Sequence, residues 1–125
     1  MKRLLALAAA LEGAIGLALM IDPSFVARLL LGEGVSGTAV PLGRVAGFGL
    51  LSLGVACWPS SEHSRAQALR GLLCYNLLTT IYLIYLGIES EWVGVLLWPV
   101  AALHAVLTTL LARACLVLSP RQIKT

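Results

Sequence analysis

Apolar residues fill four long segments of the chain, and short polar breaks separate these segments. A helix needs about 20 consecutive apolar residues to cross the ~30 Å hydrocarbon core of a membrane. Four segments approach or reach that length, at residues 4–21, 40–58, 69–88 and 92–116. The hydrophobic pattern therefore predicts an all-α membrane protein, an antiparallel four-helix transmembrane bundle that occupies residues 1–125 as a single domain.

The first polar break is followed by a shorter apolar segment. Asp22 precedes Pro23; aspartate is favoured at a helix N-cap and proline at the first helical position. Gly32 follows the apolar run and can end a helix. Residues 23–31 are too few to span a membrane, and their apolar content with the single Arg28 suits a helix lying in the membrane interface. We expect a short interfacial helix there.

The composition also indicates that lipid surrounds most of the protein. Of the 125 residues, 59% are hydrophobic and 12% are charged, whereas soluble domains carry about 25% charged residues. The net charge of +3 comes from basic residues scattered near the segment ends. Without a basic stripe or run, this charge does not indicate a nucleic-acid partner.

The distribution of basic residues predicts the orientation. With the N-terminus in the cytoplasm, seven basic residues fall on the inside and two on or near the outside. The inside group consists of Lys2, Arg3, Arg65, Arg70, Arg113, Arg121 and Lys124. By the positive-inside rule, we expect a multi-pass protein of the bacterial inner membrane with both termini inside. We expect the first helix to be retained, because Glu12 interrupts its apolar run and no small-residue cleavage site follows.

Glu12 is the only charged residue between residues 4 and 21. An ionisable group at such depth is costly in lipid and usually faces protein or water. At ~1.5 Å per helical residue, Glu12 and His104 both fall about 18 Å from the outer edge of the membrane. Asn76 lies somewhat nearer the cytoplasmic side. We therefore predict an intramembrane polar cluster of Glu12, His104 and Asn76, which Tyr75, Thr79 and Thr80 could join.

This cluster has two interpretations. A buried glutamate beside a histidine could exchange protons or hold a cationic or quinone-like ligand. The same residues could instead form a polar contact that only fixes helix packing. Replacement of Glu12 by glutamine separates these interpretations.

Arg44 is the second notable polar residue, close to the outer end of the second segment. It lies between Gly43 and Gly47, which form a GxxxG pattern that is typical of close helix contact. The long side chain could extend to the outer interface. It could also turn inward and bind an anionic headgroup, a substrate or Glu12, although the depth difference from Glu12 is about 10–15 Å.

No set of residues indicates catalysis or a metal. The three cysteines form no CxxC pair and no metal-ligand spacing. His104 is the only histidine within the predicted spans, so one chain cannot provide two axial histidines for haem. The sequence predicts no catalytic residue and no cofactor, and leaves quinone or lipid as the ligands to consider.

One stretch of the second segment carries a family resemblance. Arg44-Val45-Ala46-Gly47, followed by Leu50-Leu51-Ser52-Leu53-Gly54-Val55-Ala56-Cys57-Trp58, resembles the DoxX-like small bacterial membrane proteins. The layout of four short spans with an Asp-Pro break is similar over nearly the whole chain. The resemblance implies a four-helix inner-membrane protein, in some members associated with quinone-linked oxidation or oxidative-stress complexes. It assigns no catalytic residue.

Three functions follow as hypotheses. The leading one is a non-catalytic accessory or assembly subunit that binds other membrane protein subunits, or a homo-oligomer. The second is a proton-coupled small-molecule transporter that uses Glu12 and His104. The third is a quinone- or lipid-binding subunit of a membrane redox complex. A polar cavity reaching Glu12 would favour the transporter, and a filled core with a large apolar outer groove would favour the accessory protein. A quinone or lipid headgroup bound at Arg44 would favour the third hypothesis.

Overall fold

The computed structural model describes residues 1–59, 62–89, 91 and 93–118, which form five helices and, within this described part, no strand. The helices are α1 Lys2–Ile21, α2 Pro23–Leu31, α3 Ala39–Ala56, α4 Glu62–Glu89 and α5 Leu97–Leu118. Four of them, α1, α3, α4 and α5, are long and apolar enough to cross a membrane. The predicted all-helical class with four long apolar helices is confirmed.

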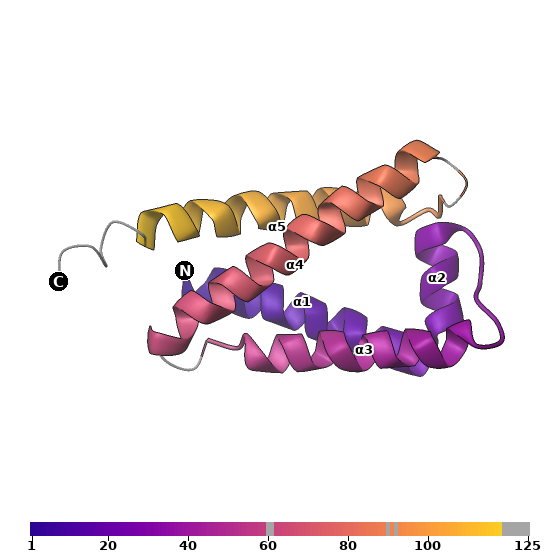
Figure 1. Cartoon of the computed structure of the whole chain (residues 1–125), viewed down its shortest axis with the longest axis horizontal. Helices are drawn as coiled ribbons and strands as arrows, with labels where there is room; N and C mark the ends of the chain where they lie inside the picture. Colours follow the sequence, from indigo (N-terminus) through magenta and orange to yellow (C-terminus); the bar gives the residue numbers. More distant parts are fainter. Residues whose placement is uncertain (60–61, 90, 92, 119–125) are drawn as a thin grey trace.

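The short helix α2 has the boundaries that its capping residues predict. The N–H of Phe25 donates to Asp22 Oδ1 at 2.9 Å, so Asp22 is the N-cap, and Pro23 follows at the first helical position. Gly32 ends the helix with φ of +88°, a left-handed conformation that glycine adopts without strain. Figure 1 shows α2 lying across the end of the molecule where α1 ends and α3 begins.

The fourth long helix begins later than predicted, because residues 93–96 are not helical. The backbone N–H groups of Gly94 and Leu96 donate to the carbonyls of Leu30 and Leu29, at 3.0 and 2.9 Å. The last carbonyls of a helix have no partner within the helix. The segment before α5 satisfies two such carbonyls of α2. Trp92, the predicted start of this span, lies outside the described residues.

The third long helix begins earlier than predicted, at Glu62 instead of residue 69. Residues 62–68 include glutamate, arginine, alanine and glutamine, which are good helix formers but too polar to be counted within an apolar span. Hydropathy therefore marked only the apolar part of a longer helix.

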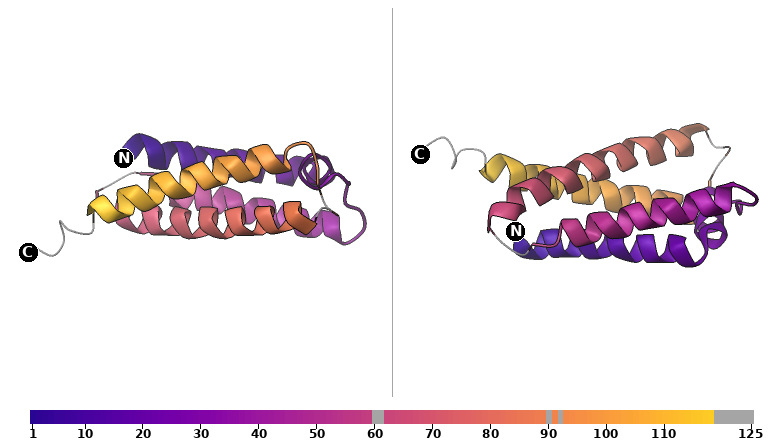
Figure 2. Two further views of the ribbon diagram at one scale, coloured as in Figure 1. Left: turned by 90° about the horizontal axis from the view of Figure 1, so that it is seen from above. Right: turned by 60° about the horizontal axis from the view of Figure 1, so that its bottom comes forward.

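The four long helices lie side by side as two closely packed pairs, α1 with α3 and α4 with α5 (Figure 2). In the first pair the backbones touch. A Cβ added to Gly16 would lie 2.8 Å from the carbonyl oxygen of Gly47, and one added to Gly54 would lie 2.6 Å from that of Ala9. Early residues of α1 thus face late residues of α3, so the two helices run in opposite directions.

The apolar core lies towards the end of the molecule where α1 begins. All four long helices or their ends contribute to it, through Leu5, Ala8, Ala9, Cys57, Ala68, Leu69, Leu72, Leu107 and Leu111. The next turns of α1, α4 and α5 carry Glu12, Asn76 and His104. The polar cluster therefore borders this core.

Candidate functional site: a buried polar cluster between the helix pairs

The structure brings together the three residues of the predicted polar cluster. Glu12 and Asn76 are 0% exposed, and His104 is 3% exposed. His104 Nδ1 lies 2.8 Å from Asn76 Oδ1 and 3.9 Å from Glu12 Oε1. Asn76 and His104 belong to the α4/α5 pair, whereas Glu12 belongs to the α1/α3 pair. The cluster therefore lies where the two pairs meet.

The hydrogen bonds fix the orientation of the Asn76 amide and show which ring nitrogen of His104 carries the hydrogen. Asn76 Nδ2 donates to the carbonyl oxygen of Leu72 at 2.9 Å. A reversed amide would place its oxygen against that carbonyl oxygen, and two acceptors repel each other. Asn76 Oδ1 therefore faces the imidazole, and His104 Nδ1 carries the hydrogen that it accepts.

Glu12 is left without a hydrogen bond. Neither of its carboxyl oxygens has a partner among the described residues. The Nδ1 hydrogen of His104 is donated to Asn76, and the 3.9 Å between Nδ1 and Glu12 Oε1 is too long for a hydrogen bond. A buried polar group without a partner is rare and points to a functional or structural cause.

Two threonines extend the polar contact between α4 and α5. The hydroxyl of Thr80 donates to the carbonyl oxygen of Asn76 at 2.7 Å, and that of Thr108 donates to the carbonyl oxygen of His104 at 2.8 Å. The two hydroxyl oxygens lie 3.4 Å apart. Since each threonine is four residues from its partner, helical spacing places them on the same face as the cluster.

Sequence reasoning did not anticipate the groove beside this cluster. A mostly apolar groove of about 740 Å³ lies between α2 and α4. Tyr75 lines it, and the ring of Tyr75 also meets that of His104 edge-on, with centroids 6.1 Å apart. Tyr75 therefore separates the groove from the buried cluster. The helix α2, which forms the other wall, could be predicted, but its position against α4 could not.

Arg44 takes no part in the cluster. Its side chain is exposed on α3, whereas Glu12 is fully buried. The two neighbouring glycines are used within the chain: Gly43 faces the ring of Pro23, and Gly47 faces the backbone of Gly16. The GxxxG pattern thus joins α3 to the α1–α2 segment of the same chain, and an inward pairing of Arg44 with Glu12 does not occur.

Comparison with known proteins adds no relative. No protein-family model matches the chain, and neither the curated proteins nor the solved structures give a match. Within the described part of the chain, no group of three or more His, Cys, Asp or Glu side chains could hold a metal ion. The cluster of Glu12, Asn76 and His104 therefore carries the functional argument.

Proposed function

We propose that this chain is a multi-pass protein of the bacterial inner membrane, an antiparallel four-helix transmembrane bundle with α2 in the outer interface. The four long apolar helices support this architecture, as do the many large apolar side chains on their outer surfaces, such as Leu42, Ile81 and Val106. Charge supports an orientation with both termini inside, since Lys2, Arg3 and Arg113 are exposed at that end. Arg121 and Lys124, which the orientation also invokes, lie outside the described residues.

Its leading function in this proposal is that of a non-catalytic accessory or assembly subunit, or a homo-oligomer. The observation that carries this function is the closed polar cluster. Glu12 and Asn76 have no exposed surface, and Glu12 lines neither the groove between α2 and α4 nor a second groove beside α3. A transporter of polar molecules needs a path to its ionisable groups, whereas a bundle that binds other membrane helices needs only outer surfaces that pack closely against them.

The test is a mass measurement made with and without crosslinking in the membrane. Cells producing a tagged and an untagged copy of the chain are crosslinked in the membrane, extracted in mild detergent and analysed by native mass spectrometry. We expect a stoichiometric complex, either with the untagged copy or with another membrane protein. A monomer without a stoichiometric partner, in both crosslinked and uncrosslinked samples, would contradict the proposal.

A second function, a proton-coupled transporter that uses Glu12 and His104, is favoured by one observation. Both carboxyl oxygens of Glu12 lack a hydrogen-bond partner among the described residues, and intramembrane carboxyl groups often serve proton relays. A pH-sensitive dye inside proteoliposomes under a membrane potential measures proton entry. The transporter predicts a proton flux that Glu12→Gln abolishes. The accessory function predicts no flux above that of protein-free vesicles, and a complex that survives Glu12→Gln.

A further inference from the structure

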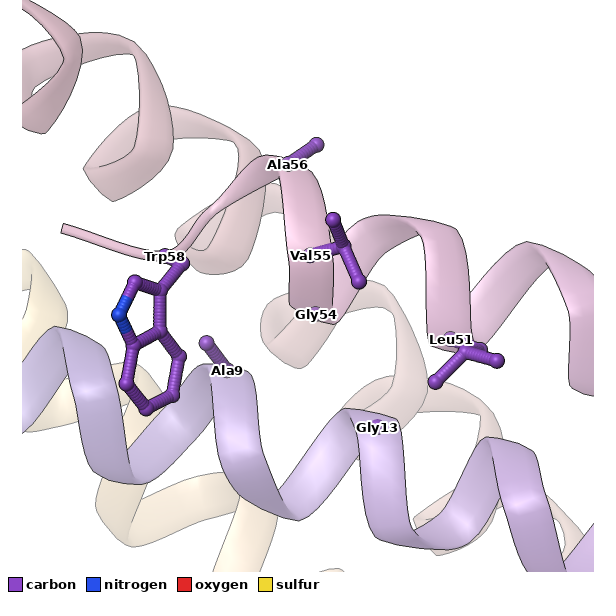
Figure 3. A pocket seen from close by; sticks show the side chains of 7 residues that line it. All are labelled: Ala9, Gly13, Leu51, Gly54, Val55, Ala56 and Trp58. Carbon is purple, nitrogen blue, oxygen red and sulfur yellow. The ribbon is translucent and has the colours of Figure 1, made fainter. Parts of the chain in front are cut away.

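A second groove, distinct from the polar cluster, lies on the outer surface of the α1/α3 pair. It has a volume of about 520 Å³ and is lined by Ala9, Gly13, Leu51, Gly54, Val55, Ala56 and Trp58. Figure 3 shows the indole of Trp58 beside Ala9 at one end of the groove and Leu51 at the other end. The groove is mostly apolar, and the residues of α1 that line it, Ala9 and Gly13, are small, so a linear hydrocarbon chain can lie against them.

The end of the groove at Trp58 has the features of a headgroup site. Trp58 is 53% exposed, and tryptophan is enriched at the membrane–water interface, where its ring is apolar and its N–H can donate to polar groups. Lys2 is also exposed. It precedes Ala9 by two helical turns, so it lies on the same face of α1, about 10 Å nearer the helix end.

Charge at this end selects the headgroup. The first turn of α1 contains no acidic residue, and Lys2 lies in line with Ala9 and Gly13 along the groove. A lysine close to the membrane surface attracts anionic lipids. Along this face the apolar groove comes first, then the indole of Trp58 and then Lys2. This is the order in which a phospholipid presents its acyl chain, its ester region and its phosphate.

We propose that this groove binds one anionic phospholipid, with an acyl chain along Ala9, Gly13 and Val55 and the headgroup at Trp58 and Lys2. The proposal depends on the membrane position proposed above, but not on the accessory function, because it requires no protein partner. A second copy of the chain could also fill an apolar groove, and the experiment below distinguishes that occupant from a lipid.

The experiment measures quenching of Trp58 by lipids that carry bromine on the acyl chain. Trp92 and Trp98 are replaced by phenylalanine, and the protein is placed in phosphatidylcholine vesicles with a small fraction of brominated lipid. We expect brominated phosphatidylglycerol to quench Trp58 at a concentration roughly fivefold lower than brominated phosphatidylcholine, the effect of one surface lysine. Equal quenching by the two lipids would overturn the proposal.

Two pairs of variants locate the site. Lys2→Gln should remove the preference for phosphatidylglycerol, whereas Arg3→Gln, which removes the same charge about 100° around the helix, should keep it. Gly13→Leu should reduce quenching by both lipids, because a Cβ there meets only Leu51 Cδ1 at 3.9 Å and the side chain fills the groove. Gly49→Leu, at a position with nothing within 4 Å, is its control.

The outcomes separate lipid binding from its alternatives. Equal loss of preference in Lys2→Gln and Arg3→Gln would show general surface attraction and contradict a site. If Gly13→Leu dissociated a complex without changing lipid quenching, a protein would occupy the groove and the proposal would be wrong. A monomeric protein that still prefers phosphatidylglycerol at Trp58 would support the lipid site while rejecting the accessory function.

Discussion

The two helix pairs achieve close packing by different means. In α1 and α3 the backbones touch through glycines, with Gly16 against Gly47 and Gly54 against Ala9. In α4 and α5 the side chains make the contact, through the hydrogen bond between Asn76 and His104 and the neighbouring threonines. Both means suit an apolar solvent, where helices associate through close packing and polar contacts. The difference predicts that the first pair is sensitive to added volume and the second to lost hydrogen bonds.

Added volume at the α1/α3 contact should have the largest effect. In Gly47→Leu, a Cβ would lie 2.6 Å from the carbonyl oxygen of Gly16 and 3.0 Å from the backbone N of Met20. Because backbone atoms cannot turn aside as side chains can, we expect a loss of at least about 3 kcal/mol, above the usual range for overpacking. Thermal unfolding in detergent measures it. Gly49→Leu adds the same side chain to open surface of α3 and should unfold like the unchanged protein.

Loss of the central hydrogen bond of the α4/α5 pair should come next. His104→Leu leaves Asn76 Oδ1 buried without a donor, which costs about 1–3 kcal/mol. The double variant with Asn76→Leu removes both partners and should cost less than the sum of the two single changes. Unfolding of all four forms measures this coupling. Strictly additive losses would show that the bond seen at 2.8 Å does not hold the pair together.

The threonine contact should matter less. Thr108→Val removes the hydroxyl that donates to the carbonyl oxygen of His104 within α5 and that lies 3.4 Å from the hydroxyl of Thr80 on α4. The carbonyl oxygen of His104 lies within the helix, where the backbone N–H four residues later can still donate to it. We expect a loss of about 0.6 kcal/mol, the average for polar contacts between membrane helices. Thr109→Val, where the hydroxyl is exposed and donates to Val106, is the matched control. A loss as large as that of His104→Leu would contradict this ranking.

Glu12→Gln should change stability least of all, by less than about 0.5 kcal/mol. No hydrogen bond of Glu12 is lost, because its carboxyl oxygens have none among the described residues, and glutamine has nearly the same shape. Unfolding of this variant beside His104→Leu measures the difference. A loss comparable to that of His104→Leu would show that the carboxyl group stabilises the junction of the two pairs.

Local sequence signals predicted the parts of the fold that depend on neighbouring residues. Asp22, Pro23 and Gly32 define α2 because caps act within one helical turn. The spans of Glu12 and His104 could be aligned by counting, because rise per residue in a helix is constant. The sequence was therefore sufficient to predict that Glu12, Asn76 and His104 lie close together, and the structure places them in one cluster.

Contacts between distant segments could not be predicted in the same way. The late start of α5 depends on hydrogen bonds from Gly94 and Leu96 to α2, which no local pattern contains. Glu12 has no hydrogen bond because His104 donates its Nδ1 hydrogen to Asn76 instead. Counting residues along a helix does not give positions precisely enough to predict which of the two side chains accepts that hydrogen. Hydropathy also missed the polar first turns of α4, because it measures how well a segment fits into lipid and does not measure helix propensity.

The position of Glu12 in the chain has a consequence for biogenesis. Its neighbours, Asn76 and His104, lie 64 and 92 residues further on, so α1 and α3 are synthesised before either neighbour and reach the membrane before α4 and α5. During that interval the glutamate has no protein cover from α4 or α5, although insertion of such a group at a helix centre costs a few kcal/mol. The glycine contact between α1 and α3 involves only residues already synthesised, so this pair can hold the carboxyl group in place until the second pair arrives to enclose it.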